Sequence, residues 1–432
     1  MPVLRRSAVL LTTVCTAAAT LAGVGLAGTA SAAPCGNAGL LGSSPLGNAI
    51  GNAFGSFGSS GGPLLGKSSS QGPLPTVSGG NTTPVAWVTG AKSPNNTEAR
   101  FGISGTDLGI SWDNGTGQTL MAFGDTFGNC NAAGQQWRHN LILRTTDTNP
   151  ADGVTIGNGV PGDVRSGAVV GSGAPTFATE SIPALEIAGV EVTTIPTAAI
   201  AIDGKQYMNY MSVRQWGGPG RWVTNSSAIA VSSDNGQTWA TQPQTVRLNL
   251  PVTVPGVEQV DDSNGKYQQN AYLRGHDDPY IYQYGTPNGR FGAAFLCRFL
   301  PGNILDLSKY QYYTGDSDPT KTWSPDTTKS KAVVTEPVSE LSVAWNNRLK
   351  RYVMLYGNET TGNLVMRTAT APQGPFSAPT TLLTSQQLGG VYAPYIYPSN
   401  GGNDQYLYFT ASRWLDYNVL MMRTDLSQIP VG

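Results

Sequence analysis

The sequence predicts an all-β protein, a five-bladed β-propeller that takes up most of the chain. Only 12% of the 432 residues are charged, about half the usual share, and Gly is abundant with 54 copies. Strand-like runs bounded by Gly, Asn and Pro recur from about residue 84 onward, and no convincing amphipathic helical period interrupts them. One strand motif also returns along the chain, which is typical of repeat architectures.

The repeated motif is Asn followed by apolar residues and, in its clearest copies, by Arg-Thr. The copies occupy these segments: 140–146, 363–368 and 418–424, with looser versions at 225–233 and 292–298. Each copy follows another strand-like run, for example 206–213, 352–356 and 405–410. Because a propeller blade normally holds four strands, five such units with long loops account for the length. A β-sandwich of similar length is the alternative.

A second motif supports the propeller independently. The segment Ser232–Trp239 reads Ser-Ser-Asp-Asn-Gly-Gln-Thr-Trp and resembles the Asp-box, a hairpin motif of sialidase-like propellers. Asp234 and Gly236 are expected to shape the turn, and Trp239 to pack on the hairpin. The role of such a hairpin is usually structural, so the motif predicts the fold more than the activity.

The N-terminus has the pattern of a secretory signal peptide. Arg5 and Arg6 precede an apolar run that ends near Leu26, and the small residues 30–32 follow as a cleavage site. We therefore expect residues 1–32 to be removed and the mature protein to be exported. No other run approaches the roughly 20 apolar residues that a membrane span needs.

The rest of the chain divides into two parts. Residues 33–78 are rich in Gly, Ser and Pro and have no sustained period, which is typical of a flexible lead-in. The propeller is expected to cover residues 79–432 and to begin near the strand 84–88.

Charge and motifs exclude several classes of function. With 26 basic and 27 acidic residues, the chain has no basic excess to bind nucleic acid or anionic membranes. Nucleotide, zinc and nucleophile-elbow motifs are absent from the sequence, so we expect no metal and no cofactor. Once the signal peptide is removed, three cysteines remain. Cys297 lies in an apolar run and is expected to be a buried free thiol, and whether Cys35 and Cys130 form a disulfide stays open.

Two aspartates in one hairpin are the main candidates for catalysis. The strand-like runs 105–112 and 120–128 flank a loop of turn-forming residues, so a hairpin centred on Thr116 would place Asp107 opposite Asp125. Opposed like charges destabilise a ladder, and carboxylates are costly among apolar strand residues. A rule broken twice in one hairpin points to function. The alternative is that both carboxylates cap backbone amides.

Further acidic and aromatic residues stand near presumed loop–strand junctions. The acidic candidates are Glu180, Asp277, Asp278 and Glu340, and for each of them a turn or capping role is the alternative. Aromatic rings at such junctions could stack on the C–H faces of sugars, or belong to the blade core: Trp112, Trp137, Trp216, Trp222, Trp345, Tyr282, Tyr392 and Trp414. The two histidines are His139 and His276, and His276 is expected to be a loop residue or at most a substrate contact.

Two carboxylates without a metal, a nucleotide motif or a histidine triad fit glycoside hydrolysis. One acts as the acid, with its pKa raised by its neighbour, and the other as nucleophile or base. A cross-strand separation of about 5 Å would favour a retaining mechanism. A register slip of one residue would remove that argument, because it turns one side chain to the other face.

Several segments resemble one family of actinobacterial exported proteins, the domain of unknown function DUF4185. They are 99–109, 123–128, 137–140 and 339–342 with the pair Trp345–Asn346, and the resemblance covers about residues 84 to 430. Known members are endo-D-arabinanases of glycoside hydrolase family 183 with a five-bladed propeller. The resemblance implies cleavage of the D-arabinan of mycobacterial arabinogalactan and lipoarabinomannan, with Asp107 and Asp125 as the acidic pair.

Three functions remain open from the sequence. The first is a secreted, monomeric glycoside hydrolase that cleaves internal furanoside linkages of a wall polysaccharide. The second is a polysaccharide-binding propeller without activity. The third is a sialidase-like enzyme, which would need an arginine cluster, although nothing groups Arg138, Arg214, Arg274 and Arg413. The predicted substrate contacts are Trp112, Trp137, Arg138, Asp278, Glu340 and Trp345.

Overall fold

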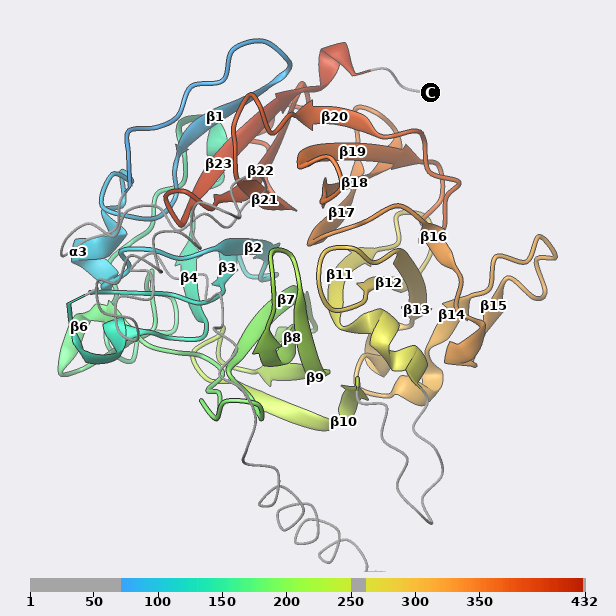
Figure 1. Cartoon of the computed structure of the whole chain (residues 1–432), viewed down its shortest axis with the longest axis horizontal. Helices are drawn as coiled ribbons and strands as arrows, with labels where there is room; N and C mark the ends of the chain where they lie inside the picture. The colour runs from blue at the N-terminus through green and yellow to red at the C-terminus, as the bar shows by residue number, and fades with distance from the viewer. Residues whose placement is uncertain (1–70, 130, 250–261, 430–432) are drawn as a thin grey trace, which may run out of the picture.

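The computed structural model describes residues 71–129, 131–249 and 262–429. Five of the six sheets in the described residues are arranged around a central axis, which confirms the five-bladed propeller (Figure 1). The expected signal peptide and the cysteines Cys35 and Cys130 lie outside the described residues. Cys297 is a buried free thiol, as predicted.

The blades are numbered along the chain, and their strands run from the axis outward. Blade 1 contains β2 (Leu108–Asp113), β3 (Thr119–Phe123) and β4 (Leu141–Thr145). Blade 2 contains β7 (Thr193–Ile202), β8 (Lys205–Trp216), β9 (Trp222–Ser232) and β10 (Ala240–Leu248). Blade 3 contains β11 (Gln269–Arg274), β12 (Ile281–Thr286), β13 (Ala294–Phe299) and β14 (Gln311–Tyr313). Blade 4 contains β17 (Leu341–Asn346), β18 (Arg351–Asn358), β19 (Asn363–Ala369) and β20 (Thr380–Leu383). Blade 5 contains β21 (Val391–Ile396), β22 (Tyr406–Arg413), β23 (Asn418–Asp425) and β1 (Thr82–Trp87).

Short elements decorate this frame. β15 (Trp323–Ser324) and β16 (Ala332–Val334) extend blade 3, and β5 (Val170–Gly171) pairs with β6 (Ala174–Ala178) beside blade 1. Within the described residues, the α-helical element α3 (Thr97–Phe101) is a single short turn, and no helix there has the length and hydropathy to cross a membrane.

The ring closes through both its inner and its outer strands. Each innermost strand packs beside the innermost strands of the two adjacent blades, so that β21 returns to β2. The outermost strand of blade 5 is β1, which pairs antiparallel with β23. The N-terminal strand therefore completes the C-terminal blade, as the blue and red ribbons at the top of Figure 1 show.

The repeated motif has one structural meaning in all five copies. The segments 140–146, 225–233, 292–298, 363–368 and 418–424 contribute β4, β9, β13, β19 and β23, the third strand of each blade. The runs that precede them form second strands such as β8, β18 and β22. A third strand faces a neighbouring blade on either side of its sheet, so apolar residues are favoured along its whole length.

The Asp-box hairpin connects β9 to β10 and is structural, as predicted. The Asp234 carboxylate accepts hydrogen bonds from the backbone N–H and the hydroxyl of Thr238, at 2.9 and 2.7 Å. The buried Arg144 of blade 1 donates to the Asn235 carbonyl at 2.9 Å. The hairpin therefore joins blade 2 to blade 1.

The structure also places part of the expected lead-in segment. The Gln71 side chain is buried and donates to the Thr89 carbonyl at 2.8 Å. The Gly72 amide donates to the Asp416 carboxylate at 3.0 Å. Contacts with the propeller thus begin before β1, the first strand, at Thr82.

Candidate active site

The hairpin of the two aspartates keeps its predicted register over only part of its length. Trp112 pairs with Leu120 and Ile110 with Ala122, as a turn centred on Thr116 requires. A bulge at Gly109 then shifts the pairing by one residue, so that the Asp107 carbonyl accepts from the Gly124 amide at 3.2 Å. The prediction that Asp107 lies directly opposite Asp125 is therefore wrong.

The bulge has a specific cause in the tertiary structure. Leu108 and Gly109 both have positive φ, 71° and 80°, a conformation that favours Gly. The Leu108 amide donates to the Ser412 hydroxyl at 2.7 Å, and the Gly109 carbonyl accepts from the Thr410 hydroxyl at 2.8 Å. Blade 5 thus holds the start of β2 away from a regular ladder. The retaining mechanism inferred from a 5 Å cross-strand pair loses its basis.

Asp107 nevertheless lies near Asp125, because its carbonyl accepts from the amide of Gly124, the residue that directly precedes Asp125. Asp107 immediately precedes β2 and is partly exposed. Its Oδ2 accepts a hydrogen bond of 2.9 Å from the Tyr392 hydroxyl in blade 5. Burial is the main cause that raises the pKa of Asp107, to about 8, and the Asp125 charge raises it further.

Asp125 is held by blade 2 and by the loop between β3 and β4. It follows β3, is buried, and its Oδ1 accepts from the Thr193 hydroxyl at 2.7 Å and from the Trp137 indole N–H at 2.9 Å. Burial raises its pKa to about 6, less than for Asp107, because the two donors stabilise the carboxylate. The two aspartates therefore differ in protonation near pH 7.

A third carboxylate and its partner lie close to Asp107. Glu340 directly precedes β17 and is buried, and Arg290 donates to both its oxygens at 3.0 to 3.2 Å. The Arg290 guanidinium also lies 4.6 Å from the centre of the Tyr392 ring. The charge of Glu340 raises the pKa of Asp107 and that of Arg290 lowers it. The ion pair of Arg290 and Glu340 thus acts on Asp107 through its charges.

All five blades contribute to this site, which we call the acidic mouth. Its residues lie where the innermost strands begin: Asp107 and Asp125 of blade 1, Thr193 of blade 2, Arg290 of blade 3, Glu340 of blade 4 and Tyr392 of blade 5. Polar groups in an apolar core are costly unless paired, and these residues pair with one another across the blades, which makes the acidic mouth the candidate active site.

Trp137 and His139 flank Asp125. The Trp137 ring lies parallel to Phe127 and 4.5 Å from the His139 ring. His139 is buried, and its Nδ1 and backbone N–H both contact Glu180 Oε2, at 2.5 and 2.8 Å. Burial lowers the pKa of His139, but the contact with Glu180 and the charges of Glu180, Asp125 and Glu186 together outweigh burial and raise it. The charge of His139 in turn lowers the pKa of Asp125.

Arg138 does not face the site. Its guanidinium is buried, donates to the Ala178 and Gly102 carbonyls at 2.8 and 2.5 Å, and lies 4.1 Å from the Phe177 ring. It therefore fixes loops around blade 1, and the structure does not bring it to the acidic pair, where a substrate contact was predicted.

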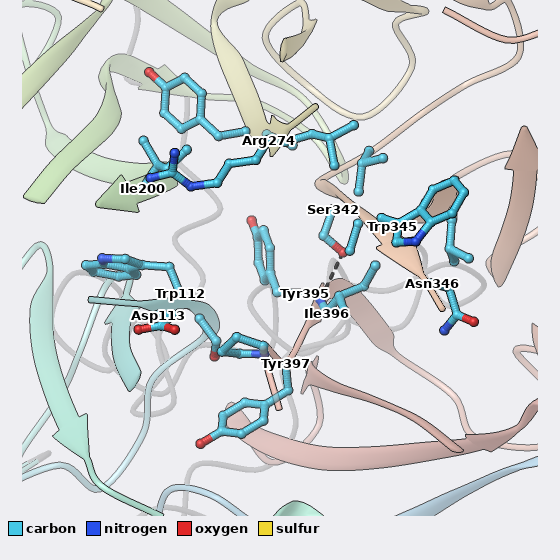
Figure 2. A pocket seen from close by; sticks show the side chains of 18 of the residues that line it. Trp112, Asp113, Ile200, Arg274, Ser342, Trp345, Asn346, Tyr395, Ile396 and Tyr397 are labelled. Atoms are coloured by element: carbon cyan, nitrogen blue, oxygen red, sulfur yellow. Dashed lines mark hydrogen bonds between the residues drawn. The ribbon is translucent and has the colours of Figure 1, made fainter. Parts of the chain in front are cut away.

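Three other predicted contacts lie at the opposite end of the ring. Trp112 and Trp345 come late in β2 and β17, where they line a cavity of about 640 Å³ at the far mouth (Figure 2). Asp278 lies between β11 and β12, where its carboxylate accepts from the Tyr282 hydroxyl at 2.8 Å. These three residues therefore do not join the acidic pair. The reason is that innermost strands run through the ring, so their two ends open at different mouths.

Sequence reasoning missed Arg290 and Thr193. Arg290 stands in the loop between β12 and β13, and Thr193 opens β7. Neither belongs to a recognisable motif, and only the closed ring brings them to the aspartates. Among the described residues, no group of three His, Cys, Asp or Glu side chains is arranged to hold a metal ion.

Comparison with known families decides the classification. The family model for DUF4185, a domain of unknown function, matches residues 92–423. The chain belongs to this family. The match spans the chain from just before α3 to β23, and therefore includes the acidic mouth and the expected family motifs at 99–109 and 339–342.

Individual relatives of this DUF4185 protein are distant. The notoamide biosynthesis cluster protein J of Aspergillus sp. (strain MF297-2) is 24% identical over 348 residues, which cover 76% of this chain and 84% of that protein. The GH43_1 enzyme of Xanthomonas citri has a TM-score of 0.42 and 13% identity, covering 80% of this chain and 90% of that one. The Bacillus subtilis arabinanase Arb43A has a TM-score of 0.41 and 10% identity, with 75% and 97% covered. The propeller assignment rests on the strand order of this chain.

Proposed function

We propose that this DUF4185 protein is a glycoside hydrolase in which Asp107 donates a proton and Asp125 acts as the ionised partner. One observation carries the proposal: two neighbouring carboxyl groups at one mouth of the ring have pKa values raised to about 8 and about 6. Near pH 7 the first is mainly protonated and the second mainly ionised. Glycoside hydrolysis requires this division between acid and anion.

The surrounding residues support these two roles. Asp107, the more exposed of the two, would give its proton to the glycosidic oxygen as the bond to the sugar carbon breaks. The Asp125 carboxylate would stabilise the positive charge that develops on the sugar, and act as nucleophile or as base toward water. Two donors fix its Oδ1, so the second oxygen would carry this role. Glu340 and Arg290 would set the proton affinity of Asp107.

For the substrate we propose the D-arabinan of a mycobacterial-type cell wall, cleaved at internal arabinofuranosyl linkages. Membership of the family and the resemblance to endo-D-arabinanases support this choice. The absence of a basic excess in the sequence fits a neutral polysaccharide better than a polyanion. The signal-peptide pattern of residues 1–32 supports export to the wall, where the protein would act as a monomer.

Two alternatives predict different features. A binding propeller without activity has no need of a carboxyl that stays protonated at neutral pH, and polar sites of that kind are costly to maintain. A sialidase-like site needs several arginines facing one substrate carboxylate. Here Arg290 pairs with Glu340, Arg413 pairs with Asp416 at 2.6 Å, and Arg138 is buried among carbonyls. The glycosidase with an acidic pair therefore explains the site best.

The test is incubation of the protein, lacking residues 1–32, with purified mycobacterial arabinogalactan, followed by sizing of the products. A ladder of arabinan oligosaccharides would support endo cleavage. Release of single arabinose units alone would contradict the internal cleavage, and no release with retained binding would favour the binding propeller. Debranched plant arabinan serves as the control for specificity toward the D-sugar.

A further inference from the structure

We propose that the far mouth of the ring is a second carbohydrate site, which binds a neutral oligosaccharide without cleaving it. The site is the cavity of about 640 Å³ at the ends of the innermost strands, which we call the far cavity (Figure 2). This volume lies within the range of about 300–1,000 Å³ that is usual for ligand pockets. The inference concerns a separate site and does not depend on hydrolysis at the acidic mouth.

The far cavity exists because small side chains line this half of the channel. Ser111 of β2, Ala199 of β7, and Ser342 and Ala344 of β17 all border it. Three of the five innermost strands thus place residues without bulk at the positions where larger side chains would fill the axis. Protein interiors are otherwise closely packed, so the open space at this end of the channel results from these small side chains.

An aromatic pair forms one wall of the far cavity. The rings of Trp345 and His276 are stacked, with centroids 4.0 Å apart and planes inclined by 11°. His276 is exposed and Trp345 is partly exposed, and both line the cavity. Trp112 borders it from β2 but is buried, and its indole N–H donates to Gln206 at 2.8 Å, so the exposed ring surface comes from the pair Trp345 and His276. Such ring surfaces offer the apolar contact that the C–H face of a sugar needs.

The polar rim selects a neutral ligand. Arg274 supplies one positive charge, whereas Asp113 and Asp404 supply two negative charges, and the amides of Asn346 and Asn347 are uncharged. A phosphate or carboxylate ligand would be repelled by this balance. Hydroxyl groups, by contrast, can donate to the carboxylates and accept from the amides and the guanidinium. The combination of ring surface and mixed polar rim therefore fits a glycan.

The far cavity is distinct from the acidic mouth. Asp107 directly precedes β2, and Asp113 is the last residue of this strand. Because a strand rises about 3.3 Å per residue, the two residues lie about 20 Å apart. Tyr395 lies between the two sites, because it lines the far cavity and also a small cleft next to Leu108 and Glu340. In Figure 2 its ring stands in the middle of the labelled side chains. Asp107 and Asp125 do not line the far cavity.

The experiment measures binding without activity, in the Asp107→Asn variant of the protein lacking residues 1–32. The probes are arabinan hexasaccharides, cellohexaose and maltohexaose, titrated by calorimetry. We expect at least one probe to bind, and Trp345→Ala and His276→Ala to weaken that binding about tenfold or more. Trp323→Ala is the matched control, because Trp323 lies in β15 at the outer edge of blade 3 and should leave the binding unchanged.

Two results would overturn the proposal. One is that none of the three probes binds to Asp107→Asn. The other is that binding persists at full strength in both variants of the aromatic pair. If Trp345→Ala fails to fold, His276→Ala decides, because the His276 side chain is 41% exposed. Hydrolysis is not read in this experiment, so its failure and that of the proposed glycosidase are separate outcomes.

Discussion

The Tyr392 hydroxyl of blade 5 donates a hydrogen bond of 2.9 Å to Asp107 Oδ2 of blade 1. This contact crosses the seam at which the last blade meets the first. The Arg290 guanidinium also lies over the Tyr392 ring. The Tyr392 side chain therefore connects the Asp107 carboxyl to the ion pair of Arg290 and Glu340. The proton affinity of Asp107 is therefore set by residues of four blades.

Removal of this hydrogen bond should make Asp107 a weaker acid. The bond lowers the pKa of Asp107, so Tyr392→Phe should raise it. A hydrogen bond to a charged group contributes about 1.5–3 kcal/mol, which corresponds to an upward pKa shift of about one to two units. We expect the alkaline limb of the kcat/KM profile to move to higher pH. An unchanged limb in a folded Tyr392→Phe variant would show that Asp107 does not titrate there.

The wild-type protein should have a bell-shaped profile with its maximum near pH 7. Activity falls below pH about 6 as Asp125 takes up a proton, and above pH about 8 as Asp107 loses its proton. The limbs report the pair as a coupled unit. The measurement is kcat/KM for arabinan between pH 4 and 10. A maximum below pH 5, with activity already lost at pH 7, would contradict the assignment.

Glu340→Gln should shift the same alkaline limb in the opposite direction. The charge of Glu340 raises the pKa of Asp107, and the Arg290 charge, then left without its partner, lowers it. Both effects lower the pKa of Asp107, and we expect the alkaline limb to shift to lower pH by on the order of one unit. The control is Glu336→Gln, because Glu336 forms a similar pair with Arg367 at 2.7 Å on blade 4. The control variant should lose stability without moving the limb.

Asp107→Asn should stabilise the protein at alkaline pH. The folded state keeps the Asp107 proton up to pH about 8, whereas an unfolded chain loses it near pH 4. The stability that this proton contributes is present below pH 4 and is lost as the pH rises to 8. Asn cannot ionise, so the variant should be more stable by about 2–5 kcal/mol at pH 8, measured by urea unfolding.

The difference in stability between Asp107→Asn and the wild type should vanish near pH 4, where residue 107 is uncharged in both proteins. Asp203→Asn in the exposed hairpin between β7 and β8 serves as the control and should change stability by less than about 0.5 kcal/mol. Equal stability of wild type and Asp107→Asn at pH 8 would mean that burial costs the Asp107 carboxylate nothing.

The sequence predicted the fold well because the signal repeats. The third strand of each blade faces two neighbouring blades, so a similar strand pattern recurs five times, four of them with a leading Asn. The Asp-box likewise predicts a local turn, since Asp234 bonds only within its own loop and to Ser232. Local and periodic features of this kind need no knowledge of distant contacts.

The site was predictable only in part. Asp107 and Asp125 are marked by their apolar surroundings, but the bulge between them depends on Ser412, about 300 positions away in the chain. Arg138 is adjacent to site residues in sequence, yet it turns inward to carbonyl groups. Trp112 follows Asp107 by five residues and still belongs to the far mouth. Residues close in sequence on a strand that crosses the ring can therefore lie at opposite mouths, so closeness in sequence does not predict a shared site.

The most direct test of the proposed hydrolase is kcat/KM on purified mycobacterial arabinogalactan for Asp107→Asn and Asp125→Asn, with Asp203→Asn as the matched control. The account predicts that both variants remain folded and lose about 10²–10⁴-fold in rate, while the control keeps the wild-type rate. Wild-type rates in a folded Asp107→Asn or Asp125→Asn variant would contradict the account.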